Sequence, residues 1–295
     1  MYWGRSVHTR GRKIKKRDPL IVQISLMVYP IKNVGCYWWW DCKIWSGRGW
    51  ASALPVTMSL LVWNCRGLGN PSTIRELGDY IRAKDPSILF LAETWIDDAR
   101  LDIVLWNFDF NNRWSIPSES RGGGLVLLWK DSINLTVVDS SKYYVDAFVD
   151  RYTEQAWHFT SFYGEPVTWR RHEAWLKLSA LNTYSTIPWL CAGNFNEFTR
   201  QDEKIGGAPR NHNQMQLFRT TIDECGLMDL GFISPKFTWS KHFTNGQSIW
   251  ERLDRGLASN SWFLRFPSTR IHHLPCLSFD HCPLLINPSG IDLPS

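Results

Sequence analysis

The chain of 295 residues lacks the features that mark several large protein classes. Its seven cysteines form no Cys-x-x-Cys pair, which argues against a zinc site and against the disulfide framework of a secreted domain. The apolar run from Leu20 to Tyr29 has ten residues and is too short to cross a bilayer. Gly122-Gly123-Gly124 is not followed by the Lys-Ser/Thr pair of a phosphate-binding loop, and there is no internal repeat. We therefore expect reduced thiols and no membrane association.

Acidic residues are scarce only near the N-terminus. Residues 1–57 contain ten Lys and Arg against two Asp and Glu, which leaves 23 basic and 26 acidic residues for positions 58–295. The net charge of +5 therefore comes from the first segment, and the rest must bind any polyanion through a local patch or a metal ion.

The basic run from Arg10 to Arg17 fits a nuclear-targeting signal or, alternatively, a solvated charge cluster. A secretory signal is disfavoured because Asp18-Pro19 interrupts the pattern and no small-residue cleavage site follows. We predict an intracellular protein.

The composition, with 44% hydrophobic and 14% aromatic residues, is sufficient for one large core. Residues 1–57 show no sustained helical or strand period, and we interpret them as an unstructured or adventitious extension rich in basic residues and tryptophan. The folded domain is predicted to span residues 58–288, with a tail at 289–295.

Within this domain the apolar patterns predict more strands than helices. Strands are expected at 59–64, 87–91, 125–129, 135–138, 144–149, 156–163, 188–192, 237–240, 249–257, 270–274 and 282–286. Helices are expected after Pro71, over 168–182 and over about 213–225, and a capping box of Thr73 and Glu76 is predicted to begin the first. This order favours an α/β fold with two packed sheets and helices outside.

Six short strings place polar side chains at the ends of apolar runs. In chain order they are Trp63-Asn64-Cys65-Arg66-Gly67, Ala92-Glu93-Thr94-Trp95, Phe162-Tyr163-Gly164, Gly193-Asn194-Phe195-Asn196-Glu197, Arg252-Leu253-Asp254-Arg255 and Asp280-His281-Cys282-Pro283. A buried strand that ends in such a string delivers a carboxylate, amide, phenol or imidazole to the rim of a sheet. That set of groups suits phosphate and a hard cation.

As an ordered set, the strings resemble the endonuclease/exonuclease/phosphatase superfamily, and most closely the endonuclease domain of plant LINE-type non-LTR retrotransposons. Other strings resemble the wording of that subgroup, namely Asp202-Glu203-Lys204, Cys225-Gly226-Leu227-Met228-Asp229-Leu230-Gly231-Phe232 and Phe237-Thr238-Trp239-Ser240. The resemblance covers about residues 58–288. It implies a DNase I-like four-layered sandwich, two packed mixed β-sheets flanked by helices. It also implies a monomeric, apurinic-endonuclease-like enzyme that hydrolyses DNA phosphodiesters with Mg²⁺ or Mn²⁺.

The resemblance assigns three residues to the metal ion. Glu93 is the principal ligand, since Mg²⁺ takes oxygen ligands and engages one or two carboxylates together with substrate phosphate. Asn64 would hold Glu93 or the metal through its amide, and Asp280 supplies a carboxylate. Some relatives carry another carboxylate two residues after this asparagine, where Arg66 stands here, so we expect one metal ion.

Five further residues are expected to act on phosphate or water. His281 would donate to a phosphate oxygen, with Asp254 orienting its ring. Tyr163 would contact the phosphate, and Asn196 would lie beside the scissile bond. Asn194 stands where relatives carry the Asp that aligns or deprotonates the attacking water. An amide cannot take that proton, and losing a general base costs about 10² to 10⁴ in rate, so we predict a well-folded but impaired nuclease.

Two other interpretations remain open. One is a non-catalytic nucleic-acid-binding remnant of a decayed element, favoured by Asn194 and by the unrelated first segment. The other keeps the fold but changes the substrate to a phosphoinositide or another small phosphoester. The histidines at positions 158, 172, 212, 242, 272 and 273 have no ligand spacing, and we expect them to be structural or on the surface.

Overall fold

The computed structural model describes residues 58–119, 122–183, 186–275 and 280–290. The predictions made for residues 1–57 and for positions 291–295 of the tail concern segments outside these ranges. None of the helices in the described ranges is long and apolar enough to span a membrane.

The first of two six-stranded sheets has the order β14-β15-β1-β2-β4-β3. Its strands are β1 (Leu60–Asn64), β2 (Ile88–Ala92), β3 (Asn112–Glu119), β4 (Gly122–Trp129), β14 (Arg270–His273) and β15 (Leu284–Asn287). β1 and β2 run parallel and the other neighbours are antiparallel. Because Asn64 pairs with Ala92, the chain leaves β1 and β2 at the same edge of the sheet.

The second sheet has the order β10-β13-β8-β7-β6-β5. Its strands are β5 (Leu135–Ser141), β6 (Tyr144–Val149), β7 (Trp157–Tyr163), β8 (Trp189–Asn194), β10 (Leu227–Asp229) and β13 (Asp254–Ser259). The parallel pair here is β7 and β8, in which Tyr163 pairs with Asn194. From the other side, Asp254 of the antiparallel β13 also pairs with Asn194. Three segments of the chain therefore meet at one edge of this sheet as well.

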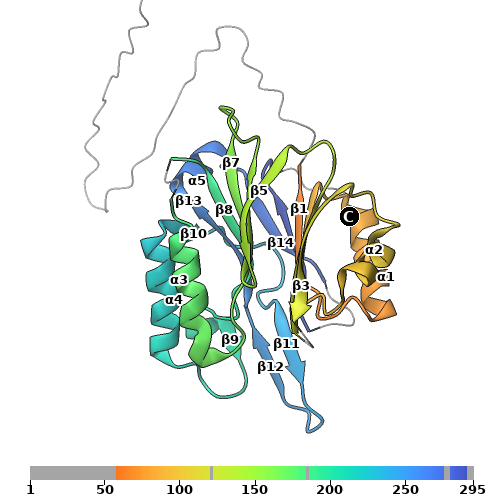
Figure 1. The fold of residues 1–295 in the computed structure, drawn as a ribbon. Coiled ribbons are helices and arrows are strands. Elements are labelled where there is room, and N and C mark those ends of the chain that lie inside the picture. The colour runs from red at the N-terminus through yellow and green to blue at the C-terminus, as the bar shows by residue number, and fades with distance from the viewer. Residues whose placement is uncertain (1–57, 120–121, 184–185, 276–279, 291–295) are drawn as a thin grey trace, which may run out of the picture. The chain divides into compact units, whose positions relative to one another are not determined.

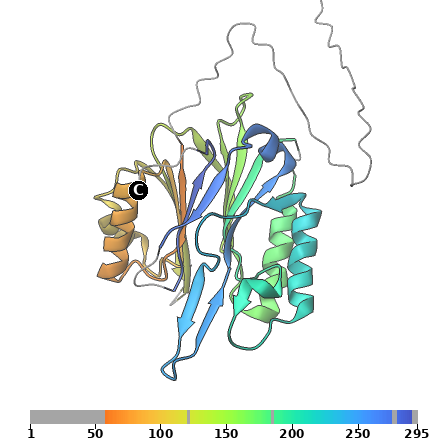
Figure 2. The same cartoon turned by 180° about the vertical axis from the view of Figure 1, so that it is seen from behind.

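A smaller sheet joins β11 (Trp239–His242), β12 (Ser248–Glu251) and β9 (Lys204–Ile205). β11 and β12 form an antiparallel hairpin that extends beyond the two large sheets, as Figure 1 and Figure 2 both show. We call residues 239–251 the projecting hairpin. It carries the exposed side chains Lys241, Phe243 and Trp250.

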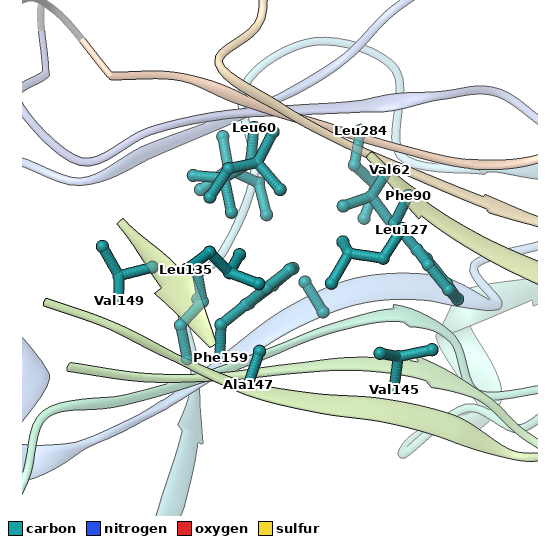
Figure 3. Close-up of a cluster of buried hydrophobic side chains, with 14 of the residues drawn as sticks. Leu60, Val62, Phe90, Leu127, Leu135, Val145, Ala147, Val149, Phe159 and Leu284 are labelled. Atoms are coloured by element: carbon teal, nitrogen blue, oxygen red, sulfur yellow. The ribbon is translucent and has the colours of Figure 1, made fainter. Parts of the chain in front are cut away.

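The main core lies between the two large sheets. Leu60 and Val62 of β1 project from the first sheet into the cluster that holds Phe159 and Val145 of the second (Figure 3). Phe159 is fully buried there. Burying a side chain of this size stabilises the folded state by about 1.5 to 3 kcal/mol, so this layer fixes the spacing of the sheets.

Helices cover the outer face of each sheet (Figure 1). They are α1 (Pro71–Lys84) and α2 (Asp98–Leu105) on the first sheet, and α3 (Arg171–Ala180) and α4 (His212–Glu224) on the second, while α5 (Asn260–Arg265) follows β13. Leu77 of α1 packs with Leu89 of β2, and Trp175 of α3 stacks on Phe162 of β7. The predicted four-layered α/β sandwich is therefore confirmed.

Two local predictions are wrong. α1 begins at Pro71 and is capped by Asn70, whose side chain accepts from the Ser72 amide at 3.0 Å, and not by a capping box of Thr73 and Glu76. Thr73 is fully buried, so it packs inside instead of capping. The predicted single strand at 249–257 is two strands, β12 and β13, which belong to different sheets.

A single side chain explains that break. The Thr238 hydroxyl accepts from the backbone amides of Leu253 and Asp254 at 3.0 and 2.9 Å. These two amides are thereby held by a side chain where the chain passes from the small sheet to the large one. Asp254 consequently begins a strand, although its string was expected to end one.

Candidate active site

The predicted site residues come together at one edge of the sandwich. Asn64 ends β1 and Glu93 follows β2, whereas Tyr163 ends β7 and Asn194 ends β8. His281 precedes β15, which is antiparallel to β1, so its chain segment enters the sheet at the edge where β1 ends. The structure thus brings six distant strings to one place.

Glu93 is the centre of one group of contacts. Its Oε1 accepts a hydrogen bond from Asn64 Nδ2 and another from the Tyr163 hydroxyl, both at 2.9 Å. Burial, followed by the charge of Glu93, raises the pKa of Tyr163, so this phenol remains a neutral donor. Since Tyr163 belongs to the second sheet, these bonds join the two sheets across the site.

His281 is the centre of a second group. Its Nδ1 lies 2.9 Å from Oδ2 of Asp254, and its Nε2 lies 3.5 Å from Nδ2 of Asn64. The Trp63 indole donates to the His281 carbonyl oxygen at 3.0 Å and fixes its backbone. Burial alone would lower the pKa of His281, but the charge and hydrogen bond of Asp254 outweigh it, and the pKa is raised. A protonated ring would present an N–H to an anion.

Asn194 lies against the same ring. Its Nδ2 is 3.3 Å from Nδ1 and 3.4 Å from Nε2 of His281. Its Oδ1 accepts from the backbone amide of Asn196 at 2.7 Å. The Asn196 side chain in turn donates to the Gly164 carbonyl oxygen at 2.7 Å. Asn194, the position predicted to align the attacking water, therefore lies beside His281 and carries an amide, which cannot accept a proton.

Asp280 is the most exposed of the predicted carboxylates, with 26% of its side chain accessible against 12% for Glu93. The Trp239 indole donates to its Oδ2 at 3.1 Å. The Arg66 guanidinium also donates to Oδ2 of Asp280. The Nε atom of Arg66 lies 3.4 Å from Oε2 of Glu93. Arg66 therefore bridges the two carboxylates that were assigned to the metal ion.

The oxygen donors at this edge fit a hard divalent cation. Glu93 and Asp280 supply carboxylates, and Oδ1 of Asn64 is buried without a hydrogen-bond partner. Among the described residues there is no group of three or more His, Cys, Asp or Glu side chains that could hold a metal ion. Carboxylate and amide oxygens are ligands that suit a hard divalent cation, and one or two carboxylates together with substrate phosphate can hold such an ion.

The backbone at the site is unusual. Eight non-glycine residues of the described chain have positive φ, and four of them, Arg66, Glu93, Trp95 and Asn196, belong to the site strings. Such conformations cost about 1 to 3 kcal/mol each and persist where the surrounding structure enforces them. Their concentration at one edge is typical of a functional site.

Several residues at the site were missed by the sequence analysis. Thr238 positions Asp254, and Trp239 and Trp63 hold the segment with Asp280 and His281. The string Phe237-Thr238-Trp239-Ser240 was noted only for its resemblance. No sequence signal distinguishes such supporting residues from ordinary core positions, because their role depends on distant contacts. Trp63, for example, contacts a residue more than 200 positions away in the chain.

Known proteins share both the sequence pattern and the fold. The model of the endonuclease/exonuclease/phosphatase family matches residues 61–275. No curated protein sequence is significantly similar to this chain. The AP endonuclease LMAP from Leishmania major superposes with a TM-score of 0.61 and 16% identity, over 78% of this chain and 86% of that one.

For two further solved structures, the match to this chain covers nearly the whole of the matched protein. The 3′ phosphatase NExo from Neisseria, bound to a product DNA hairpin, has a TM-score of 0.60 and 15% identity over 78% of this chain and 98% of that one. The endonuclease domain of TRAS1, a telomere-specific non-LTR retrotransposon, has a TM-score of 0.56 and 13% identity over 78% and 97%. At these identities the solved structures show a shared fold only. The family model matches most of the domain and therefore also shows the family. The chain belongs to the endonuclease/exonuclease/phosphatase family.

Proposed function

We propose that this chain is the endonuclease domain of a retrotransposon-derived protein, that it hydrolyses DNA phosphodiesters with a divalent cation, and that Asn194 impairs it. The observation that carries the proposal is the meeting of Glu93, Tyr163, Asp254 and His281 in two hydrogen-bonded groups that lie next to each other at Asn64. The reaction would be in-line attack of water on the phosphate that leaves a 3′-hydroxyl.

The residues divide by chemistry. Glu93, Asp280 and the Asn64 amide oxygen would hold Mg²⁺ or Mn²⁺, which supplies charge to polarise the phosphate and to stabilise the leaving oxygen. His281 would donate a hydrogen bond to a non-bridging phosphate oxygen, since Asp254 keeps its proton affinity high. Tyr163 would hold Glu93 and face the phosphate beside it.

Water activation is the weak step. The Asn194 amide can orient a water molecule by hydrogen bonding but cannot accept its proton, and Asn196 would assist the developing charge. The relatives that the strings resemble carry an aspartate where Asn194 stands in this chain. The expected deficit is about 10² to 10⁴ in rate.

DNA is favoured over a small phosphoester by the projecting hairpin. Lys241 and Trp250 are exposed on it, and its base contacts the site through the hydrogen bond of Trp239 to Asp280. A cation attracts backbone phosphate, and an exposed ring can stack on a base or enter a groove. The DNA hairpin bound by NExo and the retrotransposon origin of TRAS1 support the same choice. The strings of the plant LINE subgroup support the origin, and an intracellular, nuclear location would suit it.

A plasmid-nicking assay in Mg²⁺ tests the proposal, with Asn194→Asp beside the wild-type protein. We expect slow nicking by the wild type and a gain of at least about tenfold in the variant, with nicks that a DNA polymerase can extend. Glu93→Gln in the Asn194→Asp background should abolish the gain. If neither protein nicks and the restored carboxylate adds nothing, the assignment of function is wrong.

A second candidate is a nucleic-acid-binding protein without catalysis. The presence of Asn194 and of Arg66 between the two carboxylates favours it. It predicts DNA binding that weakens with salt, together with no metal-dependent nicking by either protein. Release of inorganic phosphate from a small phosphoester, without nicking, would instead indicate a phosphatase of the same fold.

A further inference from the structure

Arg66 lies between the carboxylates of Glu93 and Asp280 and pairs with both. Its Nε is 3.4 Å from Glu93 Oε2, and its Nη1 donates to Asp280 Oδ2. Among the described residues it is the only cation in an ion pair with either carboxylate. Its positive charge therefore offsets the charge of both carboxylates while the side chain stays in place.

One polar atom at the same place is left unsatisfied. Asn64 is 3% exposed, and its Oδ1 has no hydrogen-bond partner. Arg66 pairs with the carboxylates and does not reach this oxygen. A small divalent ion could bind the two carboxylates and the Asn64 amide oxygen together. The planar guanidinium, with its fixed donor directions, pairs with the carboxylates and leaves the amide oxygen unpaired.

Arg66 is also able to leave. Its side chain is 42% exposed, and its guanidinium carbon lies 5.7 Å from the centre of the Trp95 ring. Trp95 is itself 38% exposed. The aromatic face attracts the guanidinium in the same position in which it pairs with the carboxylates, and the exposed side chain can be displaced from there into solvent.

The geometry points to Arg66 as a resident cation that competes with the divalent ion for Glu93 and Asp280. Binding of the divalent ion then requires the guanidinium to give up both ion pairs, and the affinity for metal is reduced by that cost. The inference rests on the proposed function, because it takes Glu93 and Asp280 to be the metal ligands.

Direct measurement of Mn²⁺ binding to the full chain tests this, using the electron paramagnetic resonance signal of free Mn²⁺. We expect Arg66→Ala to lower the Kd for Mn²⁺ at least about tenfold. The matched control is Arg100→Ala, which removes the same charge from an exposed guanidinium that donates to the Gly69 carbonyl oxygen at 3.5 Å. The control should change the Kd by less than about twofold, since exposed charges are screened. Glu93→Gln should abolish binding in the wild-type and Arg66→Ala backgrounds.

Two results would overturn the competition while leaving the proposed function intact. Either Arg66→Ala binds Mn²⁺ as the wild type does, or it binds more weakly because Arg66 holds the carboxylates in place, in each case with binding that still requires Glu93. The proposed function itself fails if no variant binds Mn²⁺ through Glu93 and Asn194→Asp does not nick DNA. If Arg66→Ala and Arg100→Ala lowered the Kd for Mn²⁺ equally, the change would reflect general surface charge, and competition between Arg66 and the metal ion would be rejected.

Discussion

Asn194 and Asp254 face each other across β8 and β13, and both contact the ring of His281. An aspartate at position 194 would therefore place two carboxylates opposite each other on adjacent strands, with one imidazole between them. The amide of the present chain avoids that repulsion. Asn194 is thus a neutral neighbour of Asp254 and His281.

The first prediction follows from this pair. Asn194→Asp should lower the free energy of unfolding by about 1 to 2 kcal/mol in metal-free buffer at pH 8, because like charges directly opposite destabilise a sheet and both are buried. Urea unfolding in EDTA measures it. Asn245→Asp, an exposed change at the tip of the projecting hairpin, should stay within about 0.5 kcal/mol. Equal stability of Asn194→Asp and the wild type would contradict the prediction.

The second prediction concerns a buried ion network below the site. Glu203 accepts from Arg252 at 2.8 Å and from Arg255 at 3.0 Å, and all three side chains are buried. Glu203→Gln leaves Arg252 and Arg255 paired with Asp229 alone and should cost up to about 3 kcal/mol in urea unfolding at pH 7. Asp202→Asn removes an exposed carboxylate next in the chain and should cost less than about 1 kcal/mol.

The same residue predicts a pH dependence. Burial alone would raise the pKa of Glu203, but the charges of Arg255 and Arg252 outweigh it and lower the pKa to about 2. A carboxyl whose pKa is lower in the folded state stabilises the fold above its unfolded pKa of about 4.5, and this stabilisation is lost as the pH falls from there to about 2. Glu203→Gln should therefore show a shallower loss of stability over that range than the wild type. Parallel curves for the two proteins would contradict this.

The third prediction concerns the close approach of β7 and β8. Gly193 has φ of +154°, and a Cβ atom there would lie 1.8 Å from the Phe162 carbonyl oxygen. Gly193→Ala must shift the backbone that carries Asn194, and it should cost more than about 3 kcal/mol in thermal or urea unfolding. Gly246→Ala also has positive φ, +83°, but meets nothing within 4 Å, so it should cost only about 1 kcal/mol. Similar costs for the two would show that the contact is unimportant.

The fourth prediction tests the projecting hairpin. Lys241→Ala should weaken binding to duplex DNA several-fold and reduce the dependence of log K on log salt by about one phosphate contact. Lys177→Ala removes an equally exposed lysine from α3, on the outer face of the second sheet, and should leave binding unchanged. Fluorescence anisotropy in 50 to 200 mM salt measures both. An equal effect of the two changes would place DNA elsewhere.

The sequence identified the buried strands well because they are nearly continuous apolar runs, as in β2 and β8. It missed α2, which has eight residues and little separation of polar from apolar faces. It also missed β3, which lies at the edge of the first sheet and contains Pro117. A proline is tolerated at an edge but hides the strand from pattern reading.

The candidate site residues were predicted from the order of their strings, whereas the contacts between them could not be predicted. Arg66 was noted as a charge where a carboxylate can stand, yet nothing in the sequence showed that it pairs with both Glu93 and Asp280. Those pairs span 27 and 214 positions of the chain. Contacts between residues so far apart in the chain depend on how the two sheets pack, and a local sequence pattern carries no information about that packing.

The hydrogen bond of Tyr163 to Glu93 and that of Asp254 with His281 each join one sheet to the other. The alignment of the candidate site residues therefore depends on how well the space between the sheets is filled. A cavity opened at Phe159, which touches no reacting group, would let the sheets settle closer and carry the two halves of the site out of register. A substitution in the interior can therefore disturb the candidate site without touching any of its residues.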